Sequence, residues 1–262
     1  MVTALAGEEA SPSNNAQLTV MNSTINGNDA FGNMTLAPGS GGGISNGGML
    51  TVTNSTISDN LANGNGGGDG GGISNGGTLT VTNSTISGNI SGHGVTQGGD
   101  GGGVSNYGNL TATNSTFSGN SAPPAQGGAI FNAAQATVGD AVLNAGTSGG
   151  TIFNNGGTVT SLGYNLASDD GGGVLTGPGD QINTDPMLGP LQDNGGPTFT
   201  HALLPRSRAI NAGDPNFTPP PLYDQRGPGY PRVVNGRIDI GSFEAPMANP
   251  TPRPRPTPPP RP

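Results

Sequence analysis

The sequence predicts an all-β fold, namely a right-handed parallel β-helix solenoid followed by a C-terminal capping module. A phrase recurs along the chain, as GGGISNGGMLTVTNSTISDN from Gly41, GGGISNGGTLTVTNSTISGN from Gly70 and GGGVSNYGNLTATNSTFSGN from Gly101. Within each copy, apolar and polar residues alternate with the period of two that is typical of strands. The phrase is also rich in Gly, Asn, Ser and Thr, which are poor helix formers.

The spacing of the copies indicates a stack of short coils. The first apolar residues of successive copies are Ile44, Ile73, Val104, Ile130 and Ile152. A short period with variable insertions marks a solenoid, because one unit cannot bury its few apolar residues alone. We expect complete coils to begin near Gly41, Gly70, Gly101, Gly127 and Gly149, after a partial coil near Gln17. The right-handed sense follows from the usual hand of parallel crossovers.

Each unit contains three short strands separated by corners. In the phrase LTVTN, Leu79, Val81 and Asn83 share one face, and the two threonines between them face outward. Ile86 lies three residues after Asn83, so both point inward only if the chain bends between them. Asn tolerates the left-handed conformation that such a corner needs. The strands are therefore expected around Ile73, around Leu79–Val81 and around Ile86.

Asparagines recur at two positions of the repeat. One column holds Asn22, Asn54, Asn83 and Asn114, and the other holds Asn46, Asn75, Asn106, Asn132 and Asn154. Stacked Asn side chains can hydrogen-bond to one another and to turn backbone, so we predict Asn ladders, with Asn83 inward and paired. The alternative is glycosylation, because each NST phrase is an N-x-S/T acceptor.

Composition excludes several classes of partner and site. The net charge is −8, there is no Lys, and all eight Arg lie at or after Arg206, whereas the first 205 residues contain twelve acids. Such a surface repels nucleic acid and anionic membranes. No apolar run is long enough for a membrane span. Without Cys there is neither a disulfide framework nor a thiolate metal site, and we expect no cofactor.

The chain divides into four parts. Residues 1–15 form an irregular or truncated N-terminus, because MVTALAGEEASPSNN lacks the basic start of a signal peptide and the first repeat is incomplete. Residues 16–180 form the β-helix. Residues 181–245 form a cap whose leucines and isoleucines are expected to cover the open end of the apolar column. Residues 246–262 are a disordered Pro-rich tail.

Two sets of phrases resemble known families. GGAIFN at Gly127–Asn132 and the NSTISGN phrases resemble the β-helix repeats of polymorphic-outer-membrane-type and pectate-lyase-like bacterial proteins. The stretch from Thr184 to Asp214, DQRG at Asp224–Gly227 and DIGSFE at Asp239–Glu244 resemble the C-terminal module of choice-of-anchor Q proteins. The resemblance implies an exported bacterial surface protein, and it implies no catalytic residues.

Candidate chemistry is sparse and begins with two carboxylates. Asp69 and Asp100 each precede a Gly triplet, so they should lie on adjacent coils about 5 Å apart. Such a pair could act as the catalytic carboxylates of a carbohydrate-active enzyme or as calcium ligands. The third interpretation is that both are solvated loop residues without a specific role. The insertions between repeats are Asp29–Ser40, Leu61–Asp69, Ile90–Asp100 and Ser121–Gln126. In them Phe31 is the only aromatic residue and His93 is isolated, while His201 fits a strand of the C-terminal module.

A second candidate is the threonines of the T-x-T pairs. The pairs Thr51/Thr53, Thr80/Thr82 and Thr111/Thr113 stack across three coils, whereas Met21 interrupts the pair of the first coil. An outward threonine array could bind ice, or it reflects only the high β-propensity of Thr on a solvent face.

From these observations we expect a non-catalytic exported surface solenoid that acts as a display or adhesion scaffold. No catalytic, cofactor-binding or metal-binding residue is assigned. Its partner is expected to be an extracellular ligand such as a glycan or a cell-surface protein, and its location the cell surface or the extracellular space. The alternatives are a carbohydrate-active β-helix enzyme using Asp69 and Asp100, and an ice-binding protein using the T-x-T pairs.

Overall fold

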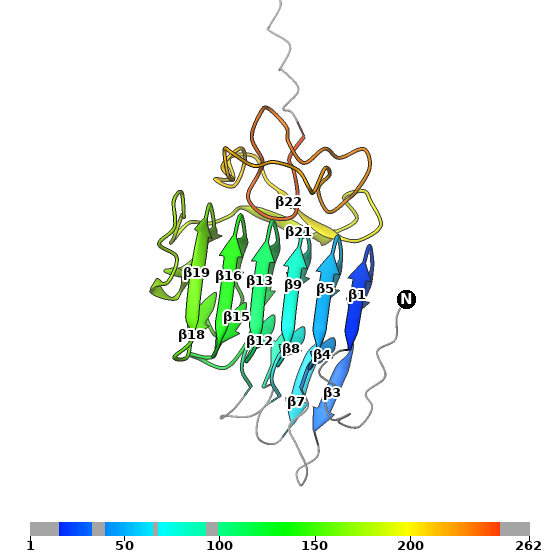
Figure 1. Ribbon diagram of the computed structural model, residues 1–262, viewed down its shortest axis with the longest axis vertical. Helices are drawn as coiled ribbons and strands as arrows, with labels where there is room; N and C mark the ends of the chain where they lie inside the picture. The colour runs from blue at the N-terminus through cyan, green and yellow to red at the C-terminus, as the bar shows by residue number, and fades with distance from the viewer. Residues whose placement is uncertain (1–15, 33–39, 65–67, 93–98, 247–262) are drawn as a thin grey trace, which may run out of the picture.

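A computed structural model of the chain describes residues 16–32, 40–64, 68–92 and 99–246. The predicted N-terminal part, His93 and the tail from Met247 onward lie outside the described residues. Within them the chain is all-β, and its helical content is one 3-10 turn, η1 (Gly171–Gly173). Parallel strands stack coil upon coil, so the predicted parallel β-helix is confirmed (Figure 1).

Two six-stranded parallel sheets run the length of the solenoid. The first sheet contains β1 (Gln17–Met21), β5 (Met49–Thr53), β9 (Thr78–Thr82), β13 (Asn109–Thr113), β16 (Gln135–Gly139) and β19 (Thr158–Gly163). The second sheet contains β2 (Thr24–Asn26), β6 (Thr56–Ser58), β10 (Thr85–Ser87), β14 (Thr116–Asn120), β17 (Val142–Ala145) and β20 (Leu166–Ala167).

Two further parallel sheets complete the coils. The third sheet contains β4 (Ile44–Asn46), β8 (Ile73–Asn75), β12 (Val104–Asn106), β15 (Ile130–Asn132) and β18 (Ile152–Asn154). The fourth is shorter, with β3 (Asp29–Gly32), β7 (Leu61–Gly64) and β11 (Ile90–Ser91). The register of the third sheet pairs Ile44, Ile73, Val104, Ile130 and Ile152 in order, which confirms the alignment of the repeats.

Two kinds of residue make the corners. Asn22, Asn54, Asn83 and Asn114 all have φ between 49° and 53°, so the predicted left-handed corner is confirmed. The other corner starts at the first Gly of each triplet. Gly70, for example, has φ 68°, and a Cβ there would collide with the carbonyl oxygen of Ile73. Only Gly avoids both the strain and the collision.

Apolar side chains from three sheets form one buried column inside the coils. Each coil contributes one residue from the third sheet, two from the first and one from the second, as in Ile73, Leu79, Val81 and Ile86, which are all fully buried. At the C-terminal end of the column, Leu175 and the half-buried Val174 pack against it, directly after η1.

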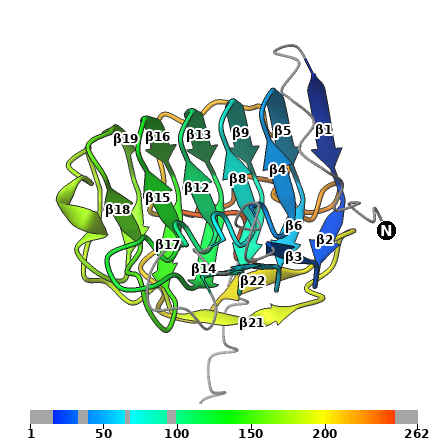
Figure 2. The same cartoon turned by 90° about the horizontal axis from the view of Figure 1, so that it is seen from below.

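Residues 181–245, here called the flank segment, lie along the side of the solenoid. The segment contains the antiparallel pair β21 (Leu188–Gln192) and β22 (Thr200–Leu203), which lies next to the second sheet (Figures 1 and 2). The predicted cap over the end of the column is therefore not confirmed. Val174 and Leu175 cover that end, and the flank segment crosses several coils instead.

The physical reason lies in the outward residues of the second sheet. Its register places Thr24, Thr56, Thr85, Thr116, Val142 and Leu166 in one row. Thr56 donates a hydrogen bond to the carbonyl oxygen of Phe199 (2.6 Å), and Thr116 accepts one from the backbone of Ser242 (3.0 Å). The apolar part of the flank segment packs beside Val142 and Leu166, where the row changes from hydroxyls to hydrocarbon.

Candidate functional site

The outward face of the first sheet carries a continuous row of threonines. Direct register partners link six of them, one from each strand: Thr19, Thr51, Thr80, Thr111, Thr137 and Thr160. Neighbouring parallel strands are about 4.8 Å apart, so the row extends over about 24 Å. The six strands lie side by side and point in one direction (Figure 1). All six threonines are exposed or half-buried.

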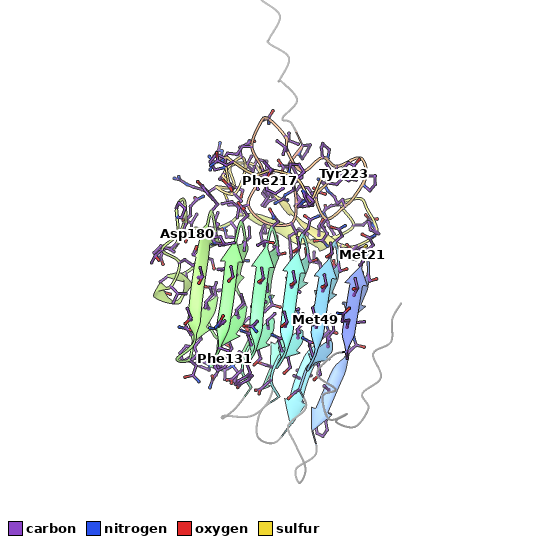
Figure 3. All side chains as sticks on the ribbon, viewed as in Figure 1. Met21, Met49, Phe131, Asp180, Phe217 and Tyr223 are labelled. Carbon is purple, nitrogen blue, oxygen red and sulfur yellow. The ribbon has the colours of Figure 1, made fainter. Side chains whose placement is uncertain are left out.

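Two rows of more mixed composition flank this central one. On one side Thr53, Thr82 and Thr113 are register partners, between Met21 at one end and Gly139 at the other. On the other side the row contains Gln17, Met49, Thr78, Asn109, Gln135 and Thr158. We call the outward side of the first sheet the threonine face. Its strands contain no Asp, Glu, Lys or Arg and no aromatic residue. Figure 3 shows these side chains, with Met21 and Met49 labelled.

The sequence revealed only part of this face. The three T-x-T pairs lie in register, and Met21 ends the side row, as predicted. Thr19, Thr137 and Thr160 also belong to the central row, but they stand in phrases that diverge from the repeat. A search for one outward Thr per strand, aligned on the buried residue before it, would have found them.

The structure brings Asp69 and Asp100 together on adjacent coils. The backbone N–H of Asp100 donates to a carboxylate oxygen of Asp69 (3.0 Å), and the hydroxyl of Tyr107 donates to Asp100 (2.5 Å). Burial raises the pKa of both carboxyls above the ordinary value. Each carboxyl is thus used to join neighbouring parts of the stack. Among the described residues, no group of three or more His, Cys, Asp or Glu could hold a metal ion.

A buried Ser–His pair joins the solenoid to the flank segment. Ser87 of β10 lies 2.9 Å from Nε2 of His201, and Nδ1 of the same ring lies 2.7 Å from the carbonyl oxygen of Gly189. Because a carbonyl only accepts, Nδ1 carries the proton and Ser87 donates to Nε2. Both residues are nearly inaccessible, at 6% and 8% exposed, and burial lowers the pKa of His201. We therefore assign the pair to the interface, with His201 in β22, the strand position expected from the sequence.

The corner asparagines also belong to this interface. Asn83 is fully buried, and its amide donates to Asn54 (2.7 Å) and to the carbonyl oxygen of Tyr223 (3.1 Å). Its pairing with Asn54 is as predicted, but Tyr223 belongs to the flank segment, so the side chain faces that segment rather than the apolar column. Asn114 accepts a hydrogen bond from Arg232 (3.0 Å). A glycan at Asn83 is incompatible with this burial.

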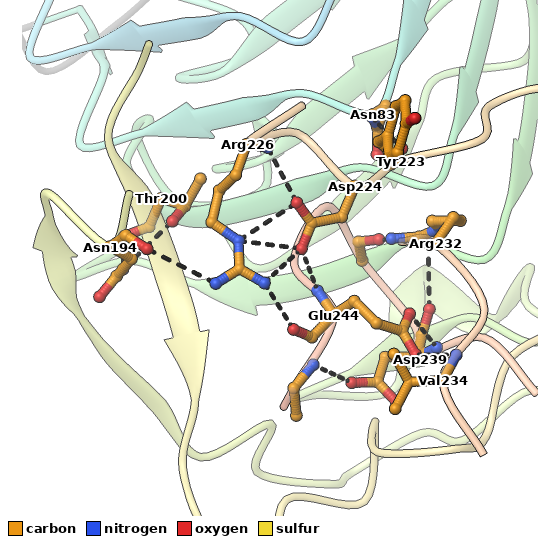
Figure 4. A network of polar contacts seen from close by, with 12 residues as sticks. Asn83, Asn194, Thr200, Tyr223, Asp224, Arg226, Arg232, Val234, Asp239 and Glu244 are labelled. Atoms are coloured by element: carbon orange, nitrogen blue, oxygen red, sulfur yellow. Dashed lines mark hydrogen bonds and ion pairs between the residues drawn. The ribbon is translucent and has the colours of Figure 1, made fainter. Parts of the chain in front are cut away.

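Two arginines of the flank segment, Arg226 and Arg232, are buried within the protein (Figure 4), whereas Arg206 and Arg208 are exposed. Arg226 forms an ion pair with Asp224 (2.6 Å) and donates to the carbonyl oxygen of Glu244 (2.7 Å). Its guanidinium also stacks on the rings of Tyr230 and Phe243. Arg232 is fully buried and donates to the carbonyl oxygens of Asp239 and Gly241. These groups hold the segment together, and none of them is presented to a ligand.

Comparison with known proteins gives no relative. No family model matches the chain, and no curated protein and no solved structure matches it either. In the parts of the chain that the structure describes, no helix is long and apolar enough to cross a membrane.

Proposed function

We propose that the chain is a non-catalytic exported surface solenoid that acts as a display or adhesion scaffold and binds its ligand through the threonine face. One observation carries the proposal: the two long sheets are treated differently, although both are lined with threonine. The flank segment buries the row of Thr56, Thr85 and Thr116, whereas the six threonines of the central row on the threonine face are exposed or half-buried.

The character of the bare face favours an uncharged ligand. The face carries no ionisable side chain, and the solenoid around it is acidic, so an anionic polymer would gain nothing there and would be repelled. Its many equivalent positions suit a ligand that itself repeats. An extracellular or cell-surface location fits such a scaffold and is part of the proposal.

We also propose that the chain is a choice-of-anchor Q type surface protein. The phrases that carry this resemblance include the residues that attach the flank segment. Gln225 of the DQRG phrase accepts a hydrogen bond from Thr85 (2.6 Å) and donates to Thr56 (2.9 Å). Asp239 and Glu244 of the DIGSFE phrase bind backbone N–H groups of the segment. These roles support a structural module rather than a catalytic one.

A binding and turnover assay tests the scaffold. We expect the protein to bind one member of a panel of immobilised neutral glycans and cell-surface proteins without releasing any product. Thr111→Tyr, in the centre of the face, should abolish the binding because the larger side chain stands above its neighbours. Ser45→Tyr, at an exposed position of β4 on the third sheet, is the matched control and should bind normally.

Two results would contradict the proposal. Equal binding by both variants would place the ligand elsewhere. If the wild-type protein releases a shortened glycan and the Asp69→Asn and Asp100→Asn variants do not, the result favours the carbohydrate-active enzyme instead.

A further inference from the structure

We propose that the threonine face binds ice. This inference rests on the proposed function, since it assigns a ligand to the same face. The ligand must be ordered in two dimensions, because the face is. The central row repeats across the strands at about 4.8 Å, through Thr19, Thr51, Thr80, Thr111, Thr137 and Thr160. Along each strand, the outward residues of the central row and of a side row are about 6.6 Å apart.

Threonine provides a rigid unit for such a lattice. Its branched Cβ leaves few χ1 rotamers, so the hydroxyl and the methyl group keep fixed directions on a strand. The hydroxyl can hold a water molecule, and the methyl group orders the water around it without competing for hydrogen bonds. Equivalent groups on six strands in register repeat this arrangement six times. Since the side chains are already ordered, little conformational entropy is lost when a rigid lattice binds.

The composition of the face separates ice from other repeating ligands. A polysaccharide is usually held by aromatic rings, and the strands of the face contain none. A charged polymer or mineral requires ionisable groups, and these strands contain none either. A second copy of the chain would need a large apolar area at the centre of the face, whereas the central row is all threonine. Met21 and Met49 lie in the side rows, and Leu162 lies at the irregularity of β19, beside Gly139.

The outward residues of the other long sheets show why only the first sheet presents an exposed threonine row along the solenoid. The second sheet carries a shorter threonine row, but Thr56, Thr85 and Thr116 are all buried under the flank segment. The third sheet begins with outward serines at Ser45, Ser74 and Ser105, and changes to Phe131 and Phe153 at the same register position. Only the first sheet keeps one small side chain over its whole length.

The test uses the full chain in cold solution. We expect the wild-type protein to produce thermal hysteresis and to inhibit ice recrystallisation. Thr111→Tyr should lose most of both activities, because it interrupts the centre of the row. Ser45→Tyr places the same ring on another exposed strand and should keep both. Circular dichroism and the melting temperature of each variant show whether the fold is retained.

The outcomes distinguish this inference from the proposed function. No thermal hysteresis from the wild-type protein, or equal hysteresis from both variants, overturns ice binding. If Thr111→Tyr loses binding to a glycan or a cell-surface protein while the wild-type protein has no effect on ice, the face is the binding site and ice is not its ligand. If the face binds nothing in either assay, both proposals fail.

Discussion

At the scale of single residues, buried asparagines satisfy one another from coil to coil. In the predicted column, Asn46, Asn75, Asn106, Asn132 and Asn154 are linked by amide-to-carbonyl hydrogen bonds of 2.7–2.9 Å. A second ladder of Asn28, Asn60, Asn89 and Asn120 was not predicted, with bonds of 2.8–2.9 Å. These asparagines end the phrases NGN, SDN, SGN and SGN at equivalent positions of successive coils, so the repeat contained the signal for this ladder.

Removing a member of the second ladder should be costly. In Asn89→Ala, the backbone N–H and the amide of Asn60 both lose their acceptor, and the carbonyl oxygen of Ile57 loses its donor. We expect a loss of about 1–3 kcal/mol or more in the free energy of unfolding, measured by denaturant titration. Asn109→Ala, at an exposed position of β13, should change it by less than about 0.5 kcal/mol. Equal losses in the two variants would show that the ladder does not stabilise the fold.

Glu244 makes stability depend on pH. Burial, and then the negative charge of Asp239, raise the pKa of Glu244 from 4.5 to about 8. Between these values the folded chain holds a proton that the unfolded chain has released, so the free energy of unfolding falls as pH rises toward 8. Asp140, with a pKa raised to about 6 mainly by burial, acts in the same direction at lower pH.

The prediction for Glu244 concerns the melting temperature between pH 6.5 and 8.5. We expect a decline in the wild-type protein and a smaller decline in Glu244→Gln, which has no group that titrates at this position. Asp193→Asn, at an exposed position, is the control and should follow the wild type. A decline of equal slope in all three proteins would exclude Glu244 as its source.

At the scale of strands, one coil carries a larger buried side chain on the second sheet and a smaller one on the first sheet than the coils beside it. Phe117 of β14 stands in register with Ile86, where the other coils carry a smaller residue, and Ala112 of β13 stands in register with Val81. Both belong to the same buried column. The larger ring on the second sheet is thus accompanied by a smaller residue on the first, as close packing requires.

A double-mutant cycle tests this exchange. Phe117→Ile alone should leave a cavity and cost about 1–2 kcal/mol. Ala112→Val alone should overpack the column and cost about 1–3 kcal/mol. Together they restore the consensus coil, so we expect the double variant to be more stable than the sum of the single changes by about 1 kcal/mol. Ala112→Val combined with Ile57→Val, which lies two coils away in the stack, should be additive. Additivity in both pairs would refute the compensation.

At the scale of the whole molecule, Gln225 attaches the flank segment to the solenoid. Its amide reaches the carbonyl oxygen of Ser55 and the hydroxyls of Thr56 and Thr198, and its carbonyl oxygen accepts from Thr85. All of these contacts are buried. The residue therefore joins two successive coils to a segment that lies far away in the sequence.

Loss of this attachment should weaken the protein as one unit. We expect Gln225→Ala to lower the free energy of unfolding by about 1–3 kcal/mol while unfolding remains a single transition. Gln192→Ala, at an exposed position of β21, is the control and should have little effect. Deletion of the segment after Gln181 should cause aggregation or loss of cooperative unfolding, because the row of Thr56, Thr85 and Thr116 becomes exposed. Two separate transitions in the full chain would show that solenoid and segment fold independently.

The sequence by itself determined the coils. Period-two alternation, Gly triplets and corner asparagines are local signals, and each coil repeats them, so the three predicted strands, their register and the Asn46–Asn154 ladder followed from the repeat. The strands of the fourth sheet, β3, β7 and β11, lie in the variable insertions and were not predicted. Asp69 and Asp100 were placed on adjacent coils for the same reason, since equal positions in the repeat must stack.

Only the tertiary structure decided where the flank segment lies, because it has no period and its contacts join residues more than a hundred positions apart, such as Thr85 and Gln225. The sequence predicted an end cap from its apolar residues, whereas the segment packs on the side of the solenoid. There Val142 and Leu166 offer it apolar contacts, and the hydroxyls of Thr56, Thr85 and Thr116 offer it hydrogen bonds. That placement buries one threonine row and leaves the other exposed. Whether a threonine is exposed therefore depends on a segment that is distant in the sequence, so the local repeat pattern cannot predict it.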